Sequence, residues 1–340
     1  MVGAVAIVIV CLATATPRYR TGTQVFGTFV NETGWDNFVA FLLGMLQSTF
    51  GLVGVDGVTH IVDEMPRPSR DAPRAMIAAP IIGAAASWIV LMVLLFCLND
   101  YDAVIESSAG PLLTIFYQST GNRGGSVALL MFPLIAMVWA AIGILTASSR
   151  TTQSFAADRG LPFSNFFSSE TKKVEVPVPA ITLNTVFVII FGCIYLGSSS
   201  ALNAILSASV VLLQFSYAIP IFLVLVRGRH LLDEVSSHGV GHKRAFNLGK
   251  WGYLVGGWAV FFCIFTDIFF LFPPERPVTG PSMNYTVVAV AVVFLLAVFS
   301  WIFHGRKHYM GPQGLERALV AARRGVEDHV LAEKDTQTVS

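Results

Sequence analysis

Long apolar runs separated by short polar segments dominate the chain. Seven runs approach or exceed the ~20 residues that a membrane-spanning helix needs, at residues 38–58, 75–98, 126–149, 180–196, 201–226, 251–272 and 285–303. An eighth run, 2–15, is shorter. We interpret it as the second half of a spanning helix rather than as a signal peptide, because no positive charge precedes it. The pattern predicts an all-α polytopic membrane protein with about eight spans.

Composition supports this class and excludes several others. Of the 340 residues 54% are hydrophobic and only 13% are charged, and the mean hydropathy is +0.66, unlike an ordinary soluble domain. The four cysteines lie in apolar runs without paired spacing, which is typical of small buried side chains rather than of a disulfide or metal site. Basic patches interleaved with aromatics are absent, which argues against nucleic-acid binding. No nucleotide loop, metal cluster or nucleophile–base pair stands out, so we predict neither an enzyme nor a cofactor.

The distribution of Lys and Arg predicts the orientation. If the spans alternate, 18 of the 22 basic residues lie on one face and only Arg18, Arg20, Arg123 and Arg276 on the other. By the positive-inside rule the richer face is cytoplasmic, and so is the carboxyl terminus. Two glycosylation triplets, beginning at Asn31 and Asn284, then lie outside, where acceptors belong.

The second run is the most informative segment. It continues to residue 64 and carries Gly51, Gly54 and Gly57 around one acid, Asp56. Glycine weakens a helix interior by about 1 kcal/mol relative to alanine, and an acid within a span usually marks a substrate, ion or proton path. The pattern predicts a helix that unwinds to form a binding site. The alternative is a glycine-rich packing face with Asp56 at the membrane interface.

Other polar positions in the spans leave two interpretations open. Thr146, Ser148 and Ser149 can ligate a cation or pack against a neighbouring helix, with packing favoured. Gln214 precedes the predicted kink at Pro220, and can face a cavity or hydrogen-bond another helix. Asp267 is a second acid in a span, but it lies near the outer end, where its carboxylate can reach the interface. Asp63 and Glu64, at the inner end of the second run, fit either a gate or simple pairing with Arg67, Arg70 or Arg74.

The order of several short motifs resembles one family of transporters. The motifs run from Asn31-Glu32-Thr33-Gly34-Trp35 through Gly51-Leu52-Val53-Gly54-Val55-Asp56, Phe155-Ala156-Ala157-Asp158-Arg159-Gly160-Leu161-Pro162 and Ser216-Tyr217-Ala218-Ile219-Pro220. Together they resemble fungal amino acid permeases of the amino acid-polyamine-organocation superfamily, in the GABA and choline permease branch. The resemblance implies a leucine-transporter-like fold of twelve helices with inverted repeats. This chain then starts within helix five and is truncated to about helices five to twelve, lacking the amino-terminal helices. It comprises a permease region at 1–310 and a cytoplasmic tail at 311–340.

The resemblance also implies a site. In the family, backbone carbonyls at the break in helix six hold the amino group of the substrate, here at Phe50, Gly51, Leu52, Val53 and Gly54. Phe50 can cap an ammonium group by a cation–π contact, although core packing also explains it. Asp56 occupies the position of an acid that couples proton uptake or gating to transport in some members.

These observations together predict a secondary active transporter. Its substrates are amino acids or related amines such as GABA or choline, it works by alternating access, and its coupling ion is the proton. We expect a multi-pass protein of the plasma membrane rather than the vacuole. The alternatives are a truncated remnant that does not transport and a receptor of the seven-helix type.

Overall fold

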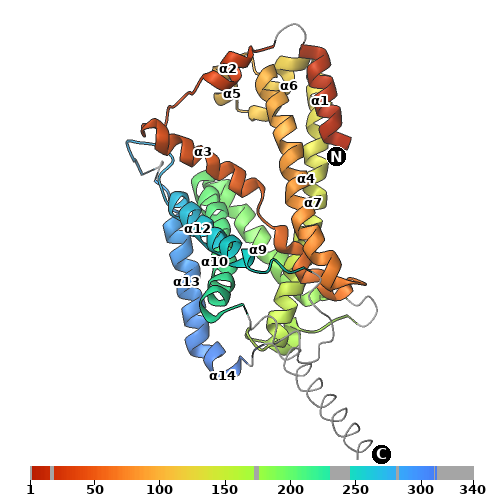
Figure 1. Cartoon of the computed structure of the whole chain (residues 1–340), viewed down its shortest axis with the longest axis vertical. Helices are drawn as coiled ribbons and strands as arrows, with labels where there is room; N and C mark the ends of the chain where they lie inside the picture. Colours follow the sequence, from red (N-terminus) through yellow and green to blue (C-terminus); the bar gives the residue numbers. More distant parts are fainter. Residues whose placement is uncertain are drawn as a thin grey trace, which may run out of the picture. The chain divides into compact units, whose positions relative to one another are not determined.

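The computed structural model describes residues 2–15, 19–171, 176–229, 246–280, 283–309 and 311 (Figure 1). These residues contain seven helices long and apolar enough to cross a membrane, namely Asn37–Val62, Pro68–Cys97, Arg123–Ala157, Val178–Gly197, Ser200–Arg227, Trp251–Phe270 and Thr286–His308. The seven predicted full-length spans are therefore confirmed, and the short first run is the helix Val2–Ala15. Apart from Gly311, the predicted tail lies outside the described residues.

The chain folds as two compact units. The first comprises Met1–Glu32, Gly54–Gly57 and Ala75–Thr146, and the second comprises Thr33–Val53, Val58–Arg74 and Ala147–Ser340. Within the described residues the β-type pairing seen is a single bridge between Thr171 and Val176. The predicted all-α class is confirmed for this part of the chain.

The first unit has its own apolar core. Its helices are α1 (Val2–Ala15), α2 (Gly22–Gly27), most of α4 (Pro68–Cys97), α5 (Tyr101–Ile105), α6 (Pro111–Thr120) and the first part of α7 (Arg123–Ala157). Cys11 of α1, Cys97 of α4 and Phe116 of α6 are fully buried in a cluster that also includes Leu129 of α7. These two cysteines are buried in apolar surroundings, as the sequence predicts, and so is Cys263 of the second unit, but Cys193 is exposed, so the prediction of burial is wrong for that residue.

Local sequence explains how the connecting helix α6 begins and ends. Gly110, at φ +92°, precedes Pro111 at the first position of the helix, and Gly121, at φ +63°, closes it in the left-handed conformation. Proline at the start and glycine after the end is the usual asymmetry of a helix. The segment between α4 and α7 thus contains a short helix with a defined start and end.

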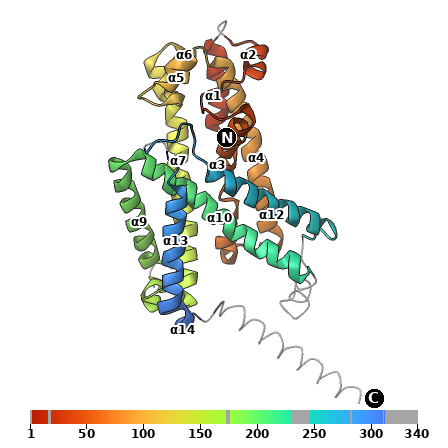
Figure 2. The same cartoon turned by 90° about the vertical axis from the view of Figure 1, so that its left-hand side faces the viewer.

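The second unit is built around α10. Its elements are α3 (Asn37–Gly51), most of the 3-10 helix η1 (Val55–Glu64), α8 (Ser164–Phe167), α9 (Val178–Gly197), α10 (Ser199–Arg227), α12 (Trp251–Phe270), α13 (Thr286–Ser300), the π-helical turn η2 (Trp301–Gly305) and α14 (Arg306–His308). Helix α10 packs against α9, α12 and α13, and α12 also packs against α3 (Figure 2). Ser198 alone separates α9 from α10 and caps α10 by accepting a hydrogen bond from the Ala201 N–H. The two helices therefore form a tight hairpin.

Two loops that are far apart in sequence contact each other. One precedes α3 and the other follows α12. The indole Nε1–H of Trp35 donates to the carbonyl of Pro273 at 3.1 Å, and the Arg276 N–H donates to the carbonyl of Thr33 at 2.7 Å. The Arg276 guanidinium lies 4.5 Å from the Trp35 ring centroid, in cation–π range. The Phe272 ring packs edge-on against the same indole, with 5.6 Å between the two ring centroids. We call this set of contacts the Trp35–Arg276 lock. It joins the start of α3 to the segment that follows α12.

Gly34 in the lock can be tested by substitution. Its φ is +72°, and an added Cβ would clash with the backbone carbonyl oxygen of Arg276. Gly34→Ala is expected to lower the free energy of unfolding by about 1–3 kcal/mol, measured by thermal unfolding in detergent. Gly44→Ala is the control, because a Cβ at Gly44 in α3 meets open space and alanine favours the helix by about 1 kcal/mol. Equal unfolding temperatures for the two variants would contradict the role of the lock.

Asn284, in the second glycosylation triplet, has a structural role. Its Nδ2 donates to the carbonyls of Phe270 at 2.8 Å and Phe272 at 2.7 Å, and its Oδ1 accepts from the Thr286 N–H at 3.0 Å. A glycan on Nδ2 would remove one of the two hydrogens that these bonds use. The Asn284 side chain therefore connects the end of α12 to the start of α13. In the folded structure it is not available as an acceptor for a glycan.

We expect a glycosylation assay to separate the two triplets. Asn284→Gln should leave the mass removed by an endoglycosidase unchanged, and should destabilise the fold by about 1–3 kcal/mol because buried carbonyls lose their donors. Asn31→Gln serves as the parallel variant in the other triplet. A mass shift that disappears in Asn284→Gln would show that this interpretation is wrong.

Candidate functional site

The helix interruption predicted from the glycines is present in the backbone. Helix α3 ends at Gly51, Leu52 turns with φ −110° and ψ 8°, and η1 begins at Val55. Gly54 has φ +88°, a conformation that glycine adopts without strain. Residues 52–54 belong to neither helix, so their peptide groups are outside a continuous helical ladder. Within a membrane such backbone is tolerated where it lines a cavity or is covered by protein.

The side chains at this break are open rather than packed. Phe50, Leu52 and Val53 are 38%, 41% and 37% exposed, and a Cβ added at Gly51 or Gly54 would meet no atom within 4 Å. Asp56 is half-buried in the first turn of η1. The structure therefore groups the predicted site residues along one interrupted segment. Their role in binding stays a prediction.

Helix α3 is attached to the second unit along its length before the break. Leu46 packs on the cluster of Val210, Val211 and Phe270, which joins α10 to α12. The Trp35–Arg276 lock fixes its beginning next to the end of α12, so α3 and α12 run antiparallel. Phe50 is one turn after Leu46, and Thr266 is one turn before Phe270. The break in α3 therefore follows shortly after its contact with the cluster that includes Phe270 of α12.

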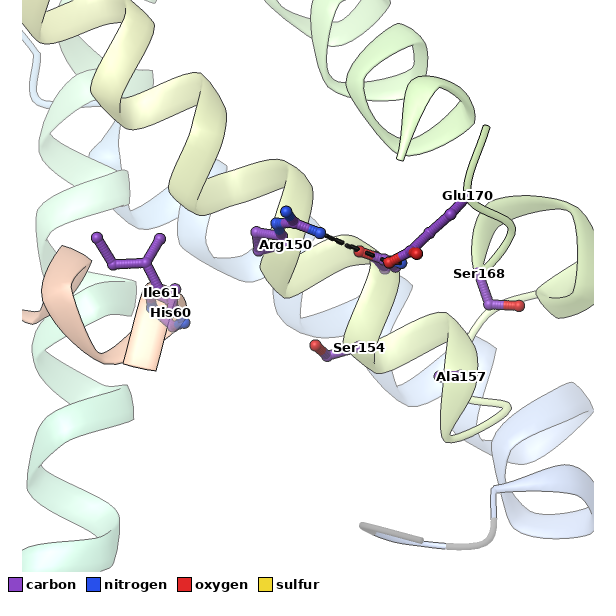
Figure 3. Close-up of a pocket in the computed structure, with 8 residues that line it drawn as sticks. His60, Ile61, Arg150, Ser154, Ala157, Ser168 and Glu170 are labelled. Carbon is purple, nitrogen blue, oxygen red and sulfur yellow. Dashed lines mark hydrogen bonds and ion pairs between the residues drawn. The ribbon is translucent and has the colours of Figure 1, made fainter. Parts of the chain in front are cut away.

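A polar pocket lies elsewhere in the second unit, where η1 meets the last turns of α7 (Figure 3). Its volume is about 320 Å³. Arg150 lies 3.6 Å from Glu170, and Gln153 donates to Glu170 at 2.7 Å and accepts from Arg150 at 3.3 Å. The remaining lining residues are His60, Ile61, Ser154, Ala157, Ser168.

Sequence reasoning missed this pocket. It gave Glu170 no partner, because the 20 residues that separate it from Arg150 leave no periodic signal. The gate considered at Asp63 and Glu64 is not tested, since those side chains lie outside the described set. Arg67, one of their expected partners, pairs with Asp71 at 3.5 Å.

The hydroxyl residues near the end of α7 bond to α9. Asn184 donates from Nδ2 to Ser148 at 3.1 Å and accepts from Thr152 at 3.2 Å. Thr146 donates to the carbonyl of Ile142 in its own helix at 2.9 Å. These contacts support interhelical packing, the favoured interpretation of these residues.

The polar residues between α10 and α12 form a buried group. Thr266 donates to the Gln214 Oε1 at 2.6 Å, and Gln214, Thr266 and Asp267 are 3%, 5% and 7% exposed. The expectation that Asp267 reaches the membrane interface is therefore wrong. The carboxyl group lies on the face of α12 that packs on its neighbours, and a short aspartate side chain cannot extend around the helix.

Comparison with known proteins defines the class. The chain matches the family described as "Amino acid permease" over residues 1–295. It belongs to this family, which confirms the predicted resemblance and its place among multi-pass membrane proteins. The relatives are named as permeases and transporters, not as enzymes.

Individual relatives are similar over most of this chain. An amino-acid permease of Schizosaccharomyces pombe, named as uncharacterized, is 34% identical over 307 residues, covering 89% of this chain and 55% of the relative. The choline transporter of Saccharomyces cerevisiae is 32% identical over 309 residues, covering 89% of this chain and 52% of the relative. The 7-keto 8-aminopelargonic acid transporter of the same yeast is 33% identical over 294 residues, covering 81% of this chain and 51% of the relative. The chain thus spans about half the length of these curated relatives. No solved structure matches significantly.

Proposed function

We propose that this chain forms the substrate-binding part of a secondary transporter for amino acids or related amines. The observation that carries the proposal is the interruption of a membrane-spanning helix at residues 52–54 in a chain of the amino acid permease family. Interrupted helices supply free backbone carbonyls for cations and helix ends for charged groups at the middle of the membrane. The relatives named for choline and for an amino acid derivative support an amine as the substrate.

In this proposal the segment Phe50, Gly51, Leu52, Val53 and Gly54 binds the amino or ammonium group. Carbonyl oxygens of the interrupted backbone accept its hydrogen bonds or contact its positive charge. The Phe50 ring contributes about 0.5–2 kcal/mol when a cation lies over its face. Its 38% exposure leaves that face accessible.

Alternating access and proton coupling complete the proposal. The protein resides in the plasma membrane with its carboxyl terminus in the cytoplasm, as the charge distribution favours. The pocket at Arg150 and Glu170 then lies toward the cytoplasmic end of α7. Asp56, in the first turn after the break, is suited to proton coupling or gating because η1 follows directly from the segment that binds substrate.

Uptake by the reconstituted chain tests the proposal. Proteoliposomes holding the 340-residue chain are expected to accumulate labelled choline, GABA or an amino acid when the proton gradient points inward. Collapse of the gradient should abolish accumulation but allow exchange of labelled for unlabelled substrate. Ligand binding without any flux would favour the receptor alternative. The absence of both binding and flux would contradict the proposal.

Substitution of Gly54 tests the backbone of the break. A residue with a Cβ at φ +88° costs about 1–2 kcal/mol, so Gly54→Ala is expected to lower uptake about 5- to 30-fold. Gly57→Ala is the matched control, because Gly57 lies in the same segment, does not have a positive φ and also faces open space. Equal uptake by the two variants would exclude a requirement for the left-handed turn.

Substitution of Phe50 tests the aromatic contact. Loss of a cation–π contact worth about 0.5–2 kcal/mol predicts that Phe50→Ala raises the KM for an ammonium substrate about 2- to 30-fold. Phe50→Trp should preserve the KM, because indole binds cations well. Phe41→Ala, on the same helix and 55% exposed, is the control. An unchanged KM in Phe50→Ala would show that the ring only packs.

A further inference from the structure

An acid without a complete set of partners is buried between α10 and α12. Asp267 is 7% exposed, and within the described residues its Oδ1 has no hydrogen-bond donor. Gln214 is itself 3% exposed, and its Nε2 has no acceptor among the residues that the structure describes. Thr266 joins the two helices at this level through its 2.6 Å bond to Gln214. Buried polar atoms nearly always have a hydrogen-bond partner in folded proteins. Two buried polar atoms without a partner in one interface therefore indicate that this site binds a further chemical species.

The position of this group relates it to the interrupted helix. Phe270 lies one turn after Thr266 and Asp267 on α12, and Leu46 of α3 packs on the cluster that Phe270 forms with Val210 and Val211 of α10. Helix α3 therefore contacts the same cluster of the second unit as the turn of α12 that follows Asp267. A displacement of α3 at Leu46 would act on this cluster, next to the turn that carries Asp267.

Few titratable groups face Asp267 from the elements packed on α12. Helix α3 carries none between residues 37 and 51, and α12 itself offers only the Cys263 thiol one turn earlier and Tyr253 near its start. Helix α10 brings Tyr217, and its Arg227 is 13 residues beyond Gln214, or about 20 Å along the helix. Arg229, just after α10, contacts Gly252 and Tyr253 at the opposite end of α12 from Asp267. In the segment after α12, Glu275 precedes Arg276, whose guanidinium lies over Trp35. No described arginine, lysine or histidine is thus available beside the carboxyl group.

We propose that Asp267 is the residue that binds the coupling proton, with Gln214 and Thr266 as its positioning residues. The inference rests on the proposed transport function and names the site of its coupling ion. A proton suits this group better than a metal ion does. Na⁺-sized and divalent cations bind through several oxygen ligands, whereas the described side chains here offer one carboxyl group, one amide and one hydroxyl. Asp56 then has the gating role.

The proton transfer is simple in chemical terms. With the site open to the outer water, a proton passes from hydronium to a carboxylate oxygen of Asp267, forming one O–H bond and releasing one water molecule. With the site open to the inner water, the same O–H bond breaks and the proton returns to water. Gln214 Nε2 can donate to the carboxylate in its charged state. The charge of Asp267 thus differs between steps of the cycle, one turn away from the cluster that the helix bearing the break contacts.

Infrared spectroscopy tests proton binding without requiring transport. For the whole chain in lipid, the difference spectrum between acidic and neutral buffer is expected to contain a carboxylic C=O band that is absent in Asp267→Asn. The band should persist in Asp56→Asn and return at a shifted frequency in Asp267→Glu, which excludes loss through misfolding. A band that survives in Asp267→Asn, or that disappears in Asp56→Asn instead, would overturn the proposal.

Flux measurements separate this inference from the transport proposal. An inward gradient of about one pH unit supplies about tenfold accumulation per coupled proton, and Asp267→Asn should lose this accumulation while retaining substrate exchange. Loss of exchange in both Asp267→Asn and Asp267→Glu would indicate a structural role and reject the assignment. Absence of flux in the unmodified chain would reject transport, and the infrared result would still decide whether Asp267 binds a proton.

Discussion

Inside the bilayer every backbone polar group needs a hydrogen-bond partner. This requirement constrains the structure more than any side-chain contact does. An unsatisfied N–H or C=O in hydrocarbon costs several kcal/mol, and a helix meets this requirement within one segment. That is why every long apolar run of the described chain is helical. Residues 52–54 are the exception in the second run, and the glycine at φ +88° makes their turn possible.

An interrupted helix needs support from elsewhere, because the break removes part of its own hydrogen bonding. In this chain the support comes from two contacts at different depths. The Trp35–Arg276 lock holds the beginning of α3, and Leu46 inserts into the cluster on α10 and α12. No residue of α3 is fully buried. Both contacts precede Gly51, so this support of α3 ends before the break.

The sequence predicted the features that depend on neighbouring residues. The spans follow from the apolar runs, and the interruption of α3 follows from three glycines around an acid. Features that depend on distant partners could not be predicted. The bond from Trp35 to Pro273 joins residues 238 positions apart, and the pairing of Arg150 with Glu170 crosses a loop. Asp267 was wrongly expected at the interface, because hydropathy gives the depth of a residue but not the face of the helix on which it lies.

The burial of Asp267 changes how coupling can be understood in this fold. An acid at the membrane interface would respond to the outer solution alone, whereas an acid enclosed between α10 and α12 responds to the packing of those helices. Leu46 of α3 packs on the cluster that contains Phe270, and Phe270 lies one turn from Asp267. The helix that bears the break thus contacts the same apolar cluster that follows the buried acid on α12. Two sites that share one movable helix can be coupled without a long pathway, because the displacement of that helix changes the surroundings of both.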